Sequence, residues 1–164
     1  MPPNPTSTLG RLMTAPMRPG QVVWLGLRPA RREAMQVLEA VELVAGRGLA
    51  GDRYASRGGA RQVTLIQAES LAAIASHLGL DAVAPEALRR NVVTRGVNLL
   101  ALKGRRFRLG GARLEYSGEC HPCSRMEETF GPGGYNAVRG LGGITARVLE
   151  SGPVRLGDAL TVDG

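Results

Sequence analysis

The stretch "ITARVLESGPVRLGDALTV", residues 144–162, decides the fold class. It contains three short apolar segments, "ITARVLE", "VRL" and "ALTV", which have the length and composition of β-strands. The turn-forming residues Ser151-Gly152-Pro153 and Gly157-Asp158 separate them. Short strands at this spacing predict a small β-barrel that is closed or partly closed.

Upstream, the stretch "RFRLGGARLEY" at 106–116 alternates apolar and polar residues on both sides of Gly110 and Gly111. Two glycines tolerate the positive φ of a tight hairpin turn, so we expect two antiparallel strands here. The stretch "RQVTLIQAESLAAIASHLG" at 61–79 begins with β-branched and apolar residues and continues with helical spacing until Gly79. It therefore predicts a strand followed by a helix.

The stretch "APEALRRNVVTRG" at 84–96 places Pro85 at the start of a short helix and returns to a strand after Asn91. Arg89, Arg90 and Asn91 are therefore expected at a helix-to-strand corner. "QVVWLGL" at 21–27 is typical of a buried strand, whereas "REAMQVLEAVELVAGRG" at 32–48 fits either a helix or a long bent strand.

Length and composition indicate one globular domain. The chain has 164 residues, 43% hydrophobic and 21% charged, with 23 glycines and 10 prolines that favour short strands and tight turns. Residues 1–20 are rich in proline and lack periodicity, so we expect a flexible N-terminal tail, 1–20, and a β-barrel domain, 21–164. No apolar run reaches the roughly 20 residues of a membrane helix, and no signal peptide precedes the domain, which predicts a cytoplasmic protein without a membrane partner.

The positive charge of the chain is carried by arginine. The net charge is +7, and Lys103 is the single lysine among 21 basic residues. Guanidinium groups match phosphate and carboxylate, so an anionic ligand is one explanation, and an arginine-rich codon usage is the other. Aromatic residues make up only 4% of the chain and the arginines are scattered, which disfavours a nucleic-acid partner.

Both cysteines lie in "GECHPCSRMEE", residues 118–128. Structural zinc needs four ligands, but the chain adds only His77 and His121, and Ser124 stands where covalent haem attachment needs a histidine. A thioredoxin-like dithiol between Cys120 and Cys123 remains an alternative, although the pair comes late in the chain. One activated sulfur near His121 and Arg125 is the favoured interpretation, and two small buried cysteines are the structural alternative.

Six stretches in this order resemble the MOSC domain, a family named for the C-terminal domain of molybdenum cofactor sulfurase. The resemblance runs from about residue 20 to residue 162, and the stretches are "GRGLAGDRY", "RQVTLIQAESL", "LRRNVVTRGVNL", "CHPCSRM", "GLGGITARVL" and "GPVRLGDAL". It implies a mainly β protein with a few short helices and a closed MOSC-type β-barrel of complex topology.

The resemblance also implies a sulfur chemistry. Cys123 matches the functional thiol, which either accepts sulfur from a pyridoxal-phosphate-dependent cysteine desulfurase for a molybdoenzyme or binds the metal of the molybdenum cofactor. The second role implies reduction of N-hydroxylated compounds, and whether the chain is an enzyme, as a sulfurtransferase-type carrier or an oxidoreductase, stays open. Cys120 is a possible resolving thiol. Lys103 lies in a turn, so the chain is not itself the desulfurase.

Further residues match positions that contact the cofactor in the family. Arg89 and Asn91 resemble its "R-x-N" element and are expected to bind the pterin phosphate or ring edges. Arg61 and Gln62 match a lining segment. Arg53, beside Asp52, either lines the site or closes the turn at Gly51. Tyr54 stands where relatives often have histidine.

The glycine-rich stretch 131–143 lacks the lysine and hydroxyl residue that end a phosphate-binding P-loop. It is therefore expected as a mobile loop beside the site. His77, in the last turn of its helix, is expected to be solvated.

Overall fold

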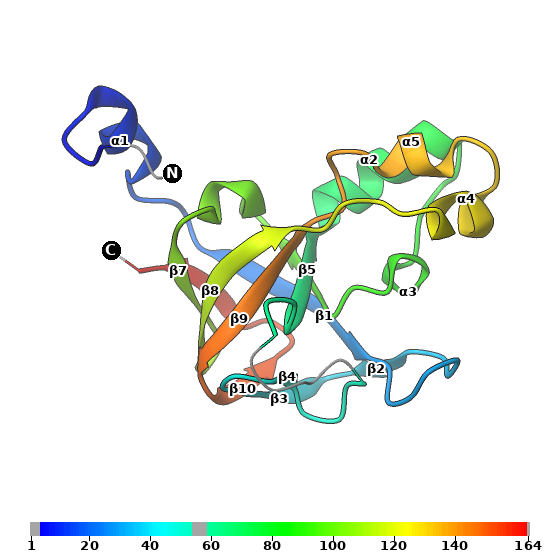
Figure 1. The fold of residues 1–164 in the computed structure, drawn as a ribbon, viewed down its shortest axis with the longest axis horizontal. Coiled ribbons are helices and arrows are strands. Elements are labelled where there is room, and N and C mark those ends of the chain that lie inside the picture. Colours follow the sequence, from blue (N-terminus) through cyan, green and yellow to red (C-terminus); the bar gives the residue numbers. More distant parts are fainter. Residues whose placement is uncertain (1–3, 54–58, 164) are drawn as a thin grey trace.

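A closed β-barrel forms the centre of the molecule in the computed structural model, which describes residues 4–53 and 59–163 (Figure 1). Its strands run in the order β11-β7-β8-β9-β5-β6-β1, and a pairing between β11 and β1 closes the ring. The predicted closed barrel is confirmed. The strands are β1 (Gly20–Leu27), β5 (Val63–Gln67), β6 (Val92–Arg95), β7 (Arg106–Leu109), β8 (Ala112–Glu119), β9 (Ile144–Glu150) and β11 (Ala159–Val162).

The barrel mixes two kinds of strand pairing. Strands β5 and β6 are parallel, with Leu65 opposite Val92, whereas the other pairs around the described ring are antiparallel. A parallel pair needs a crossover, which here passes through the helices α2 (Ala68–Leu78) and α3 (Pro85–Leu88). The predicted strand and helix at 61–79 and the hairpin at Gly110 are confirmed, and Gly110 has the positive φ of 56° that its turn requires.

The segment 32–48, for which two conformations were open, forms strands. β2 (Gln36–Leu38) pairs with β1, and β3 (Ala40–Val44) forms a second sheet with β4 (Gly48–Leu49) and β10 (Gly152–Arg155). Val41 and Leu43 are buried while Glu42 between them is exposed, which is the period-two pattern of a half-buried strand.

Two hydrophobic clusters stabilise the fold. The first fills the barrel and includes Leu25, Leu65 and Phe107, all fully buried. The second lies between the outer face of β5 and β6 and the helices, and it includes Ile66, Ile74, Val93, Met126 and Val138. Adjacent residues Leu65 and Ile66 point to opposite faces of β5, and both faces are covered. The helices that contribute to the second cluster therefore pack against one side of the barrel (Figure 1).

The remaining helices are short: α1 (Thr8–Met13), η1 (Leu99–Leu102), α4 (Arg125–Phe130) and α5 (Gly134–Val138). Helix α5 lies inside the glycine-rich stretch 131–143, so the expectation of a loop there was wrong. His77 Nδ1 lies 3.0 Å from the carbonyl oxygen of Ala137 and so links α2 to α5, although its ring is exposed to solvent as expected.

Within the first twenty residues, the Ser7 hydroxyl caps α1 by accepting from Gly10 N at 2.9 Å. The mobility of this segment stays a prediction. In the part of the chain that the structure describes, every helix is too short or too polar to cross a bilayer.

Candidate functional site

A cavity of about 770 Å³ opens on the side of the barrel where the helices α3 and α4 face the β1–β2 loop. Four parts of the chain meet there: residues 28–35 after β1, residues 52–53 with Arg61 and Thr64 before and within β5, residues 87–91 at the α3–β6 corner, and residues 121–129. A volume of this size lies in the range of pockets that hold a small ligand or cofactor. We call it the arginine cavity.

Cys123 lines the arginine cavity from the segment between the end of β8 and the start of α4. Its side chain is exposed, and His121, Pro122 and Arg125 from the same segment line the cavity with it. Cys120 is only 4% exposed, and its backbone N donates to Gly143 O at 2.9 Å. Both are free thiols, so the structure does not support the disulfide of the dithiol alternative. The Cys123 sulfur is accessible to solvent, whereas the Cys120 sulfur is buried.

The predicted corner between α3 and β6 is confirmed. Arg89 ends α3 in the left-handed conformation with φ 58°, lies exposed, and lines the cavity. Asn91 also lines it, but its side chain is largely engaged: Oδ1 accepts from Thr64 N at 3.1 Å and from Thr64 Oγ1 at 3.0 Å, and Nδ2 donates to Gly26 O at 3.2 Å. At most one amide hydrogen is left for a ligand. Asn91 chiefly positions the corner.

Arg90 is a member of the site that the sequence analysis placed at the corner but did not assign to ligand binding. It is only 9% exposed, and its guanidinium is fixed by two carbonyl groups, with Nε donating to Gly142 O at 2.7 Å and Nη1 to Leu88 O at 2.5 Å. Burial lowers the pKa of Arg90, an effect that the neighbouring Cys120 opposes. Three of its five N–H groups have no partner among residues 4–53 and 59–163.

The other predicted residues divide between the cavity and the scaffold. Arg53 and Arg61 line the cavity. Gln62 does not: it is 2% exposed, its Nε2 donates to Gly59 O at 2.7 Å, and its Oε1 accepts from Val148 N at 2.9 Å. Its amide therefore joins the chain before β5 to β9.

Asp52 fixes the neighbouring turn through the backbone of Arg28. Its Oδ1 accepts from Arg28 N at 3.0 Å, and Arg28 O accepts from Arg53 N at 2.8 Å. These two bonds hold the backbones of Arg28 and Arg53 side by side, and both residues line the cavity. Tyr54 lies outside the described residues.

The charge of the site is strongly positive. Two carboxylates, Asp52 and Glu128, are set against eight arginines. The arginines are Arg28, Arg31, Arg32, Arg53, Arg61, Arg89, Arg90 and Arg125. Several guanidinium groups around one cavity favour an anionic ligand, which they can bind through charge-assisted hydrogen bonds.

The family model of the MOSC domain matches residues 51–161, which include the barrel from β5 to β11, the corner and both cysteines. The chain belongs to the MOSC domain family. The match confirms the resemblance seen in the sequence motifs. No curated protein sequence gave a significant match.

Several solved structures share the fold of this MOSC domain. YuaD from Bacillus subtilis superposes with a TM-score of 0.78 at 23% sequence identity, covering 88% of this chain and 96% of that one. YiiM from Geobacillus stearothermophilus has a TM-score of 0.72 at 18% identity, over 88% and 75% of the two chains. YiiM from Escherichia coli has a TM-score of 0.66 at 20% identity, over 88% and 70%. At these identities the likeness establishes the fold.

The MOSC site offers donors that suit a molybdenum cofactor. Among the described residues, no group of three or more His, Cys, Asp or Glu side chains is placed to hold a metal ion. Cys123 supplies one soft sulfur donor, and the arginines supply partners for a phosphate and for oxo groups. Together with the volume of the cavity, this donor set fits a pterin dithiolene that brings most of the metal ligands itself.

Proposed function

We propose that this MOSC domain binds the molybdenum cofactor in the arginine cavity, with Cys123 as the protein ligand of the metal. The observation that carries the proposal is the exposed thiol of Cys123 on the wall of a cavity lined by eight arginines. A reactive thiol alone does not require eight neighbouring arginines. A bulky anionic cofactor with a soft metal requires both the sulfur and the guanidinium groups.

Different residues of the site would bind different parts of the cofactor. Cys123 Sγ supplies the thiolate ligand, and Arg53, Arg61 and Arg89 neutralise the phosphate and other anionic oxygens. Asn91 keeps the corner in place through Thr64 and Gly26. When bound, the cofactor supplies a redox-active molybdenum centre, which suits reduction of N-hydroxylated compounds.

A second candidate function is transfer of sulfur, and the exposure of Cys123 on a short surface segment favours it. The Cys123 thiolate would attack the outer sulfur of a persulfide on a cysteine desulfurase that uses pyridoxal phosphate. A new S–S bond forms on Cys123, the donor's S–S bond breaks, and the donor leaves as a thiolate. A molybdoenzyme would be the acceptor. This exchange belongs in the cytoplasm, where thiols stay reduced.

The experiment measures molybdenum and bound sulfur on the same sample. Protein purified from a host that makes the cofactor is analysed for molybdenum by elemental analysis and for a persulfide adduct of about 32 Da by intact mass. Molybdenum without the adduct supports the cofactor role, and the adduct without molybdenum supports the carrier role.

Two cysteine variants make the assignment specific. Cys123→Ala should lose whichever signal the native protein shows, whereas Cys120→Ala should keep it because the Cys120 sulfur is buried. Absence of both signals from the native protein, or their survival in Cys123→Ala, would contradict the proposal. A requirement for Cys120 equal to that for Cys123 would instead support dithiol chemistry.

A further inference from the structure

Arg61 depends on its backbone for its place in the arginine cavity. Within residues 4–53 and 59–163, its guanidinium has no hydrogen-bond or ion-pair partner. Its charge nevertheless lies close to another cation, because burial lowers the pKa of Arg90 and the charge of Arg61 lowers it further. Where the Arg61 side chain lies is therefore decided by the backbone that carries it.

Two side chains hold the carbonyl groups that precede Arg61. The Gln62 amide donates to Gly59 O at 2.7 Å. The Ser117 hydroxyl, from β8, donates to Ala60 O. Both peptide groups directly before Arg61 are therefore attached to side chains.

The Ser117 hydroxyl is the second link of a directed chain of hydrogen bonds. Ser117 has a single hydroxyl hydrogen, and Ala60 O can only accept, so this hydrogen points to Ala60 O. Ser117 Oγ also lies 2.9 Å from Thr145 Oγ1 of β9. Thr145 must therefore be the donor in that contact. Gly118 leaves room for the pair, because a Cβ there would lie only 3.3 Å from Thr145 Oγ1.

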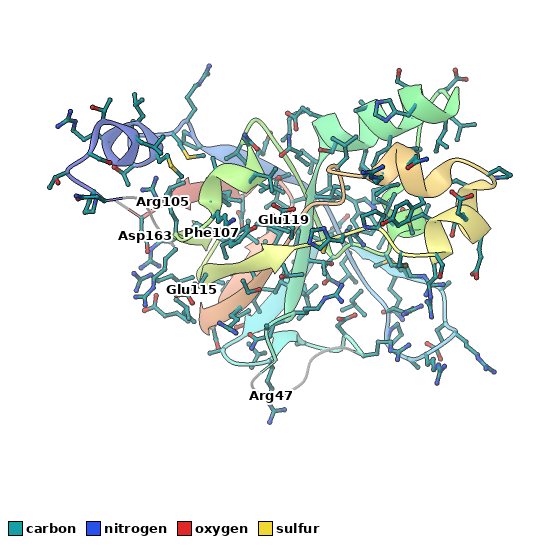
Figure 2. The ribbon with its side chains drawn as sticks, turned by 45° about the horizontal axis from the view of Figure 1, so that its top comes forward. Arg47, Arg105, Phe107, Glu115, Glu119 and Asp163 are labelled. Atoms are coloured by element: carbon teal, nitrogen blue, oxygen red, sulfur yellow. The ribbon has the colours of Figure 1, made fainter. Side chains whose placement is uncertain are left out.

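An irregularity in β8 brings Ser117 to this position. The pairing of β8 with β9 shifts between Tyr116 and Gly118, so Ser117 is the extra residue of a β-bulge. It lies on β8 between Glu115 and Glu119, which are labelled in Figure 2. Bulges re-aim side chains and are over-represented next to active sites. Regular pairing of β8 with β9 would not need this extra residue.

Arg61 lies between two hollows. One is the arginine cavity, and the other is a smaller hollow of about 300 Å³ that Ser117 and Thr145 line. Arg61 and His121 line both. A long side chain at this position has room to turn to either side, so the direction of its backbone selects one of them.

We propose that Ser117, oriented by Thr145, is a positioning residue that directs the Arg61 side chain into the arginine cavity, where Cys123 lies. The inference deepens the proposed function and rests on it for its purpose, since Arg61 is one of the cations assigned there to the cofactor. Ser117 and Thr145 do not line the arginine cavity themselves. They act only through Arg61.

The test compares two alkylating reagents at Cys123 in the full-length, metal-free protein. Iodoacetate is an anion and iodoacetamide is neutral, but the thiolate attacks both and displaces iodide. The ratio of the two rates therefore cancels the ionised fraction of Cys123 and reports the positive potential around the sulfur. Peptide mapping confirms that Cys123 is the residue modified.

Loss of the Arg61 charge or of its anchor should lower this ratio. At about 0.01 M ionic strength, where charges are weakly screened, Arg61→Ala should lower the ratio of the iodoacetate rate to the iodoacetamide rate by at least about threefold. Ser117→Ala should lower it by at least about twofold, because Arg61 is then no longer held toward the cavity. An unchanged ratio in either variant would overturn the proposal.

The double variant separates positioning from a general structural effect. If Ser117 acts through Arg61, Ser117→Ala should lower the ratio no further in the Arg61→Ala protein. A second fall of the same size in that background would contradict the proposal. Thermal unfolding checks that each variant is folded, and a loosened fold alone would change the rates of both reagents alike.

Two changes at Thr145 test the hydroxyl chain itself. Thr145→Ser keeps the hydroxyl and should leave the ratio unchanged. Thr145→Val removes it, so Ser117 loses its second partner and the ratio should fall in the same direction as in Ser117→Ala. Equal ratios in the two Thr145 variants would show that the hydroxyl does not orient Ser117.

Ser151 offers a matched control at the other end of β9. Its hydroxyl also holds a backbone group, accepting from Ala45 N at 2.8 Å, but Ser151 lines neither hollow. Ser151→Ala therefore removes a comparable hydrogen bond and should keep the native ratio. If it lowers the ratio as much as Ser117→Ala does, the positioning role is wrong.

The alkylation ratio also distinguishes this inference from the proposed function. A lowered ratio in Ser117→Ala, with a native protein that retains neither molybdenum nor sulfur, would keep the positioning role and remove the proposed function. Molybdenum or sulfur on the native protein, with an unchanged ratio in Ser117→Ala, would keep the proposed function and remove the positioning role.

Discussion

Asn91, the residue before β6, is joined through both backbone and side chain to Thr64, the second residue of the parallel strand β5. Asn91 N donates to Thr64 O at 3.1 Å and to Thr64 Oγ1 at 3.0 Å, while Asn91 Oδ1 accepts from Thr64 N at 3.1 Å. The corner that carries Arg89 and Arg90 is therefore anchored at its last residue. The site depends on this anchor as much as on the residues that face the cavity.

Asn91→Ala should destabilise the fold markedly. The change leaves Thr64 N and Gly26 O without their side-chain partner in a buried region, and each unsatisfied group costs about 1–3 kcal/mol. We expect the free energy of unfolding to fall by about 3 kcal/mol in urea denaturation. Thr64→Val, which removes only the hydroxyl, should cost about 1 kcal/mol. An Asn91→Ala protein as stable as the native one would show that the amide is not an anchor.

Gly142→Ala should disturb the site through the backbone. A Cβ at Gly142 would overlap the carbonyl oxygen of Cys120 and lie 3.4 Å from Arg90 Nη2. Because the obstacle is backbone, we expect a loss of about 2 kcal/mol or more and a changed alkylation rate at Cys123.

Gly140→Ala is the control for this change. A Cβ there meets open space, but the φ of 76° disfavours alanine by about 1 kcal/mol. This variant should be mildly destabilised and keep the native rate of Cys123 alkylation. Equal effects of the two alanines on that rate would argue against the Gly142 contact.

The two cysteines should differ sharply in reactivity. Cys123 is exposed and Cys120 is 4% exposed, so iodoacetamide should modify one thiol in the native protein and two after unfolding. Intact mass and peptide mapping give the count and the position. Cys123→Ala should show no rapid modification, and rapid double labelling of the native protein would mean that Cys120 is reachable from solvent.

Tyr116 should ionise at a higher pH than an ordinary tyrosine. Burial raises its pKa above 10.0, and the charges of Glu119 and then Cys120 add to the effect. In a spectrophotometric titration, Glu119→Gln should move this pKa back toward the ordinary value, and Tyr116→Phe identifies the signal. Because the folded pKa lies above the unfolded one, the contribution of Tyr116 to stability is present below pH 10 and is lost as the pH rises through the folded pKa. An unchanged titration in Glu119→Gln would exclude the charge effect.

Elements with strong local signals could be predicted from the sequence. The strand and helix at 61–79 follow from their change of period, and the hairpin at Gly110 follows from its glycine pair. The segment 32–48 could not be decided, because the burial of Val41 depends on β10, where Val154 is its partner more than a hundred residues later. Helix α5 was missed for a similar reason, because it is stabilised by packing against α4 and α2 and its own sequence does not have a good helical composition.

The site was predicted in part. The cysteine pair and the arginine corner could be found from spacing and resemblance, and Cys123 does line a cavity with Arg53, Arg61 and Arg89. The sequence does not show which of two adjacent arginines turns inward. That choice depends on the left-handed φ of Arg89 and on the carbonyl of Gly142, which is distant in the chain. Gln62, next to Arg61, does not line the cavity because Gly59 O and Val148 N hold its side-chain amide.

The pairing of β11 with β1 has a consequence for how the protein is made. Gly20 of β1 pairs with Leu160 of β11. During synthesis, β1 therefore lacks one of its two barrel neighbours until β11 has left the ribosome. During synthesis, the nascent chain therefore exposes an unpaired strand edge, the kind of surface on which chains associate. Chaperone demand in the cell should rise with any change that delays this final pairing.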